Sequence, residues 1–72
     1  MDKLRVYFDR EGNTLSVWFD DPKKEFLCEE SADDVVLVRD RNGRVVGFER
    51  LNFLSPLQRK KGVNIPVEVQ MV

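Results

Sequence analysis

The chain has 72 residues, with 13 acidic side chains against 12 basic ones, one cysteine and no histidine. A chain this short buries only about 60% of the surface that its unfolded form exposes, and one cysteine excludes the internal disulfide that stabilises many small domains. Without histidine, the commonest general base and the commonest nitrogen ligand for metals are both missing. We therefore expect a single small domain over residues 1–72 that is not an enzyme, holds no metal or cofactor, and gains stability as a homodimer.

The charge is distributed unevenly along the chain. Residues 1–38 hold ten acids and five bases, giving −5, whereas residues 39–72 hold seven bases and three acids, giving +4. Such asymmetry either steers a partner or is evened out where strands of the two halves interleave in one sheet. The longest apolar run, Val35 to Val38, is far shorter than the roughly 20 residues of a membrane span. Together with the lone Cys28, this predicts a cytoplasmic protein without membrane contact.

The first two expected strands flank an Asp-Arg-Glu-Gly turn within residues 4–19. Apolar side chains recur at every second position on both sides of the turn, which is the period of a strand with one buried face. A four-residue loop sets Phe8 against Leu15 and Val6 against Val17, so that all four lie on one side of a β-hairpin. We expect this side to be the core side.

The middle of the chain contains two more expected strands. Residues 25–30 form a third strand between a proline-containing turn at 20–24 and a second turn at 31–34. Residues 35–39 form a fourth strand with apolar side chains on both faces. A strand of that kind is typical of the middle of a sheet that is covered on both sides.

A second hairpin follows, with Arg41-Asn42-Gly43 as a three-residue loop and Gly43 in the left-handed conformation of a bulge. This loop sets Val38 against Val46 and Val36 against Phe48. The alternative, a two-residue Asn-Gly turn, shifts the register by one residue and matches the apolar side chains less well.

The last part of the chain changes character. Ser55 as N-cap and Pro56 in the first turn predict one short helix near 55–61. Apolar residues then alternate from Val63 to Met71, which predicts a C-terminal edge strand or an arm, with residues 62–72 exchanged between two chains in the second case. The fold class is thus mainly β, an antiparallel meander of two hairpins plus a third strand.

Two segments carry a family resemblance. Residues 8–17 read Phe-Asp-Arg-Glu-Gly-Asn-Thr-Leu-Ser-Val, and residues 40–51 read Asp-Arg-Asn-Gly-Arg-Val-Val-Gly-Phe-Glu-Arg-Leu. They resemble the two hairpins of the family known as domain of unknown function 2283, small bacterial and archaeal proteins. Asn13 stands where the family usually has aspartate, and Phe48 where it has isoleucine. The resemblance implies a β-rich fold over roughly residues 4–54, no assigned activity, and for part of the family an antitoxin role.

Candidate partner-binding residues fall into three groups. The aromatic side chains of Tyr7 and Trp18 share the face opposite the core side of the first hairpin, with Arg5 close enough to Trp18 for a cation–π contact. They form either a second layer of packing or a subunit contact. Glu49, beside Gly47, either pairs with an arginine or anchors a partner. The further candidates for partner binding are those of the arm: Val63, Ile65 and Val67.

The remaining chemistry is sparse. Cys28 has no histidine to activate it, and we expect Glu29 and Glu30 to raise the pKa of its thiol. The basic run Arg59, Lys60 and Lys61 is the candidate for nucleic-acid contact, although it lacks an aromatic stacking platform.

Three functions follow from these features. The first is a non-enzymatic protein-interaction module that forms a homodimer. The second is an antitoxin-like partner of a small basic RNA-cleaving toxin encoded nearby, attracted by the acids of residues 20–34. The third is a weak nucleic-acid binder that uses the basic C-terminal half.

Overall fold

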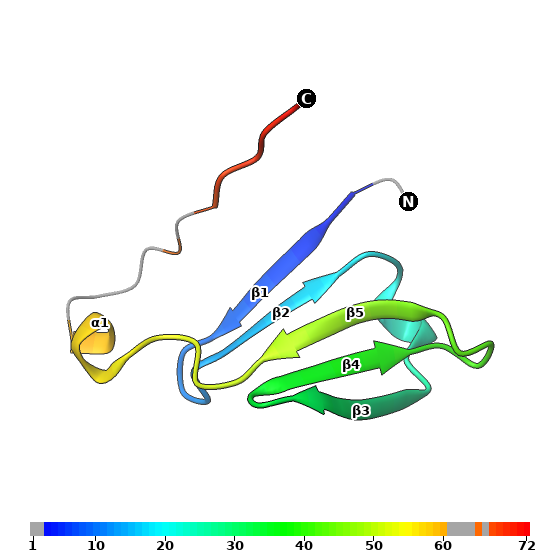
Figure 1. The fold of residues 1–72 in the computed structure, drawn as a ribbon, viewed down its shortest axis with the longest axis horizontal. Helices are drawn as coiled ribbons and strands as arrows, with labels where there is room; N and C mark the ends of the chain where they lie inside the picture. Colours follow the sequence, from blue (N-terminus) through cyan, green and yellow to red (C-terminus); the bar gives the residue numbers. More distant parts are fainter. Residues whose placement is uncertain (1–2, 61–64, 66) are drawn as a thin grey trace.

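The computed structural model describes residues 3–60, 65 and 67–72 of the chain (Figure 1). Within them, five antiparallel strands form one sheet in the spatial order β1-β2-β5-β4-β3, which confirms the mainly β prediction. The elements in chain order are β1 (Arg5–Asp9), β2 (Thr14–Trp18), the 3₁₀ turn η1 (Pro22–Lys24), β3 (Leu27–Ala32), β4 (Val35–Arg39), β5 (Val45–Arg50) and the helix α1 (Pro56–Lys60).

Strands from the two halves of the sequence interleave. β2 lies beside β5, and this pairing joins the β1–β2 hairpin to the β3–β4–β5 meander (Figure 1). β5 is therefore the middle strand, and β1 and β3 are the outer ones. The charge that is uneven along the sequence is spread over one sheet, as the interleaving alternative predicts.

The first hairpin has the predicted register. Val6 lies opposite Val17 and Phe8 opposite Leu15, and four residues connect β1 to β2. The last loop residue, Asn13, has a φ of 53°, a left-handed conformation that asparagine tolerates better than most side chains. Alternating apolar residues and a turn with suitable residues are together sufficient to fix a hairpin of this kind.

The second hairpin has a different register from the one predicted. Gly43 has the expected left-handed conformation, with a φ of 80°. However, Val38 lies opposite Gly47 rather than Val46, because the register shifts between Val38 and Arg39 at a bulge. The prediction was wrong because it matched side chains within this hairpin alone and did not include the pairing of β5 with β2.

The β2–β5 pairing explains why residue 47 is a glycine. Gly47 lies opposite Trp18 on one side and Val38 on the other. A Cβ atom at position 47 would lie 2.7 Å from the Val17 carbonyl oxygen and 2.9 Å from Cε3 of the Trp18 ring. The indole therefore lies over the glycine, and only a residue without a side chain permits this close approach.

The third strand starts and ends two residues later than predicted. Asp21 caps η1 by accepting a hydrogen bond from the Lys23 main-chain N–H at 2.9 Å, and the strand follows as β3 (Leu27–Ala32). The following turn is shortened to two residues, with Asp34 at a φ of 62°. The predicted fourth strand coincides with β4.

The C-terminal part is only partly as predicted. α1 (Pro56–Lys60) confirms the short helix, and Ser55 and Gln58 cap it reciprocally through their side chains and main-chain N–H groups. Residues 65 and 67–72 belong to no strand, so the expected edge strand is absent from them. Lys61, Val63 and Pro66 lie outside the described residues. The exchanged arm over residues 62–72 stays a prediction.

The buried core is small. Among the described residues, the buried apolar side chains are Trp18, Val38 and Val46, and Val38 has no accessible surface. η1 lies against β5 near this cluster (Figure 1). α1 lies beyond one end of the sheet, so neither helical element of the described chain extends across the strands. The sheet is a single layer, whereas stable domains are built from at least two.

Candidate functional site

One side of the sheet presents a continuous row of apolar side chains. Residues that lie opposite one another in paired strands point to the same side. The strand registers therefore place Val6, Val17, Phe48 and Leu37, from four neighbouring strands, in one row. The pair Phe8 and Leu15 lies beside this row. We call this surface the apolar face, and its residues are Val6, Phe8, Leu15, Val17, Leu37 and Phe48.

The apolar face is open to solvent within the described chain. None of its six residues is buried, and Val6 on the outer strand is 42% exposed. Phe53 packs edge-on against Phe8, with ring centroids 6.2 Å apart, and covers one end of the face. Phe19 contacts Phe48 at 5.9 Å. The centre of the face is thus organised by aromatic contacts but lacks a covering layer.

Charged side chains lie beside these apolar ones in two pairs, with Arg50 opposite Leu15 and Glu29 opposite Leu37 on the same side of the sheet. Arg39 contacts Glu29 with an Nη2–Oε1 distance of 3.4 Å, and Arg50 contacts Asp34 with an Nη1–Oδ2 distance of 3.7 Å. Each pair joins a base to an acid, so the pairs add no net charge to the border. Exposed pairs of this kind contribute only about 0.2–1 kcal/mol to folding stability.

The aromatic pair predicted for partner binding is divided by the structure. Both residues lie on the side of the sheet opposite the apolar face. Tyr7 is 54% exposed there, whereas Trp18 is 8% exposed and packs within the chain over Gly47. Of the two alternatives for Trp18, its burial favours intramolecular packing. The cation–π contact of the described residues joins Arg41 to Phe26, with Cζ 5.0 Å from the ring centroid, instead of Arg5 to Trp18.

Glu49 lies on the same side of the sheet as Tyr7, between Ser16 and Val36. It is half-buried. The ion pairs among residues 3–60 are Lys24–Asp20, Arg39–Glu29 and Arg50–Asp34, so the arginine partner expected for Glu49 is not among them.

The pKa of the Cys28 thiol is raised above its ordinary value in this structure. Desolvation raises its pKa most, followed by the hydrogen bond from Sγ to the Glu25 carboxylate at 3.5 Å and by the charges of Glu25 and Glu49. The direction is the predicted one, but the acids responsible are different from the expected Glu29 and Glu30. A nucleophilic cysteine requires the opposite shift.

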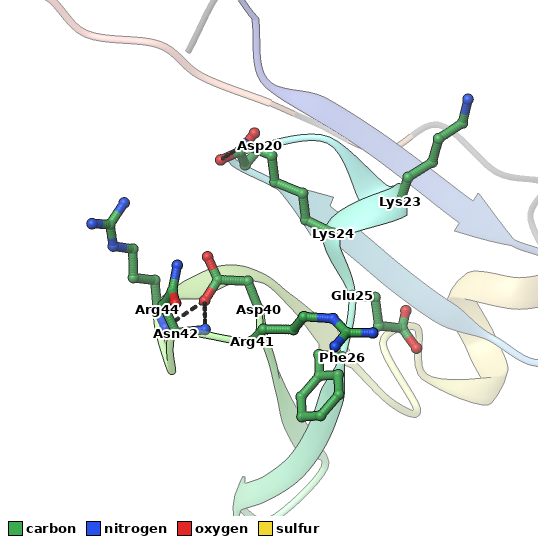
Figure 2. Close-up of a pocket in the computed structure, with 9 residues that line it drawn as sticks. All are labelled: Asp20, Lys23, Lys24, Glu25, Phe26, Asp40, Arg41, Asn42 and Arg44. Atoms are coloured by element: carbon green, nitrogen blue, oxygen red, sulfur yellow. Dashed lines mark hydrogen bonds and ion pairs between the residues drawn. The ribbon is translucent and has the colours of Figure 1, made fainter.

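A cavity of about 380 Å³ lies between η1 and the β4–β5 loop (Figure 2). Figure 2 shows the Arg41 guanidinium above the Phe26 ring and the Asp40 carboxylate turned into its own loop. Asp40 accepts hydrogen bonds from the main-chain N–H groups of Asn42 and Arg44, both at 2.9 Å. The sequence signal for this loop, Asp-x-x-Gly, therefore describes a turn and not a ligand site.

The other wall of the cavity is also internally bonded. Lys24 contacts Asp20 with an Nζ–Oδ2 distance of 3.0 Å, and Lys23 extends away from the other lining side chains (Figure 2). The hydrogen bond from the Asp21 N–H, and then the one from Lys24, hold the pKa of Asp20 below its usual value. These interactions hold each wall in place, the Arg41–Phe26 contact joins the two walls, and we assign no ligand to the cavity.

Of the basic run near the C-terminus, Arg59 and Lys60 belong to α1, and Lys61 lies outside the described residues. Arg59 donates a hydrogen bond from Nη2 to the Arg10 carbonyl at 3.0 Å, which ties α1 to the β1–β2 loop. Lys60 ends α1 and is exposed. In the arm, Ile65 is half-buried and Val67 is 66% exposed.

The described residues contain no group of three or more histidine, cysteine, aspartate or glutamate side chains arranged to hold a metal ion. Neither η1 nor α1 has the length and apolar character that a membrane-crossing helix requires.

Comparison with known proteins gives one match. A family model described as "Protein of unknown function (DUF2283)" matches residues 5–53, which span β1 to the segment after β5 and make up more than half of the chain. No curated protein and no solved structure matches this chain.

Proposed function

We propose that this chain, which belongs to the DUF2283 family, is a non-enzymatic protein-interaction module that binds through the apolar face of its sheet. The observation that carries the proposal is the single-layered sheet, with a row of apolar side chains that no element of the described residues covers. Contiguous exposed apolar surface on a small protein is typical of a protein–protein interface.

The surface area supports the same interpretation. The chain has an accessible surface of 5994 Å², whereas a compact monomer of its 8.4 kDa mass exposes about 4,600 Å². Part of the difference of about 1,400 Å² comes from residues 67–72, whose side chains are exposed. A partner that covers the apolar face would supply the missing burial.

The test uses two neighbouring positions on β4, Val36 and Leu37. Leu37 belongs to the apolar face and Val36 to the opposite side, and both are half-buried. Three tagged chains are used for affinity capture from the host: Leu37→Lys, the Val36→Lys control and the unsubstituted chain. An untagged copy of the chain is present in each capture. We expect every stoichiometric partner to be lost with Leu37→Lys and retained with Val36→Lys. Equal retention by both variants, or no stoichiometric partner at all, contradicts the proposal.

A second candidate is an antitoxin-like partner of a small basic RNA-cleaving toxin. The observation that favours it is β3, an outer strand whose six residues are all exposed and include Glu29 and Glu30. Acids at a sheet edge attract a basic protein electrostatically. This candidate predicts a neighbouring gene for a small basic protein. The toxicity of that protein should be relieved by this chain and not by its Glu30→Lys variant. A gene without such a neighbour counts against this candidate.

A further inference from the structure

We infer that the occupant of the apolar face is a second copy of this chain, packed face to face across a twofold axis near Phe48. The inference rests on the proposed function and adds to it the identity of the partner and the geometry. Two sheets that pack in this way lie about 10 Å apart with their strands inclined by about 30°. The result is a two-layered sandwich, the architecture that one chain alone lacks.

The position of Phe48 makes the face suitable for a twofold contact. β5 is the middle strand of the order β1-β2-β5-β4-β3, and Val17 and Leu37 flank Phe48 on the two neighbouring strands. A twofold axis that runs parallel to β5 at the centre places Phe48 against its own copy, and Val17 of each chain near Leu37 of the other. A central aromatic side chain surrounded by aliphatic ones is typical of the energetic centre of an interface.

The charges around the face favour a second copy over a charged partner. Two identical surfaces present the same charges to each other, so they associate only where those charges are balanced. The border pairs Arg39–Glu29 and Arg50–Asp34 are balanced within each chain. A strongly basic or acidic protein would find no net opposite charge on this face.

The area is also sufficient. Each partner of a standard interface buries about 800 Å². The chain exposes 5994 Å², about 1,400 Å² more than a compact monomer of its mass. An interface of standard size is thus smaller than this excess.

The main experiment compares Val6→Lys with Tyr7→Lys. The two positions are neighbours on β1, they are 42% and 54% exposed, and they point to opposite sides of the sheet. Light scattering is expected to give twice 8.4 kDa for the unsubstituted chain. Val6→Lys is expected to raise the dimer dissociation constant by about 10-fold or more, whereas Tyr7→Lys leaves it unchanged. Circular dichroism establishes that both variants are folded.

A crosslinking measurement does not depend on the stability of the lysine variants. The photoreactive residue benzoylphenylalanine replaces Phe48 in one protein and Tyr7 in another. Irradiation is expected to give a covalent dimer from position 48 and none from position 7. A monomer at high micromolar concentration, equal weakening by both lysine variants, or crosslinking from position 7 alone overturns the inference. A monomer that captures a different protein through Leu37 overturns only the inference and leaves the proposed function intact.

Discussion

The side chain of Asn13 makes two hydrogen bonds with the main chain of Leu54, 41 residues away. Nδ2 donates to the Leu54 carbonyl at 2.8 Å, and Oδ1 accepts from the Leu54 N–H at 2.9 Å. Asn13 is 6% exposed, and its own carbonyl accepts a third bond from the Phe53 N–H at 3.0 Å. The amide thus fastens the segment after β5 to the first hairpin.

Asn13→Asp is therefore expected to destabilise the chain. An aspartate accepts from the Leu54 N–H but presents a second oxygen, instead of a donor, to the Leu54 carbonyl. We expect a loss of about 1–3 kcal/mol in the free energy of unfolding, measured in urea at neutral pH. The loss should shrink at acidic pH, where the protonated carboxyl can donate again. Asn42→Asp, the same change in the exposed β4–β5 loop, is the control and should cost little. Equal losses at both positions would contradict the role of Asn13.

Gly47→Ala is expected to disturb the core around Trp18. The added Cβ would meet the Val17 main-chain oxygen at 2.7 Å, and that atom cannot move without displacing β2. A loss of about 1–3 kcal/mol and a red shift of the tryptophan fluorescence should follow. Gly12→Ala is the matched control, because its Cβ would meet only the end of the Asp9 side chain, at 2.8 Å. A fluorescence spectrum unchanged by Gly47→Ala would refute the packing described for Trp18.

The Cys28 thiol is expected to react slowly with iodoacetamide until the pH is strongly alkaline. Its pKa is raised by desolvation and by Glu25 and Glu49, so the thiolate forms at higher pH in the folded chain than in the chain unfolded in urea. Because the folded-state pKa is the higher one, the thiol's contribution to stability is complete below about pH 8.5 and is lost as the pH rises through the folded-state value.

The substitution Glu25→Gln tests the cause of this shift. It removes the charge next to Cys28 and should move the alkylation profile to lower pH. Glu29→Gln removes a charge that pairs with Arg39 instead, and it should leave the profile in place. Identical profiles for the folded and the unfolded chain would show that the environment of Cys28 has no effect.

Ionic strength separates the two proposed kinds of partner. An apolar contact between two copies should keep nearly the same dissociation constant between low and high salt. A complex in which Glu29 and Glu30 attract a basic protein should weaken strongly, because salt screens exposed charges. Sedimentation equilibrium at two salt concentrations measures the difference. A dimer that dissociates in high salt would indicate a charged interface instead of the apolar face.

Local pattern was sufficient for some parts of the fold and insufficient for others. The first hairpin followed from alternation and turn chemistry, because Phe8 and Leu15 are close in sequence. The register of the second hairpin did not, since it depends on Trp18 lying over Gly47 from a strand about 30 residues earlier. Pairing between distant strands leaves no signal in either strand alone.

The candidate site shows the same division. Alternation correctly grouped Val6 and Val17 on one side, but it could not show that this side would lie open while Trp18 on the other became buried. That outcome depends on where η1 lies against β5. Asn13 was noted in the sequence only as a departure from the family's aspartate, because its partner Leu54 is remote in the chain.

The outer strands have a consequence for how large an assembly can become. An unpaired strand at the border of a sheet is a template on which further chains polymerise, and natural proteins prevent this with charged side chains and local irregularities. β3 carries two consecutive glutamates and a register shift between Glu30 and Ala32. Growth into fibrils is thereby disfavoured along the β3 border of the sheet.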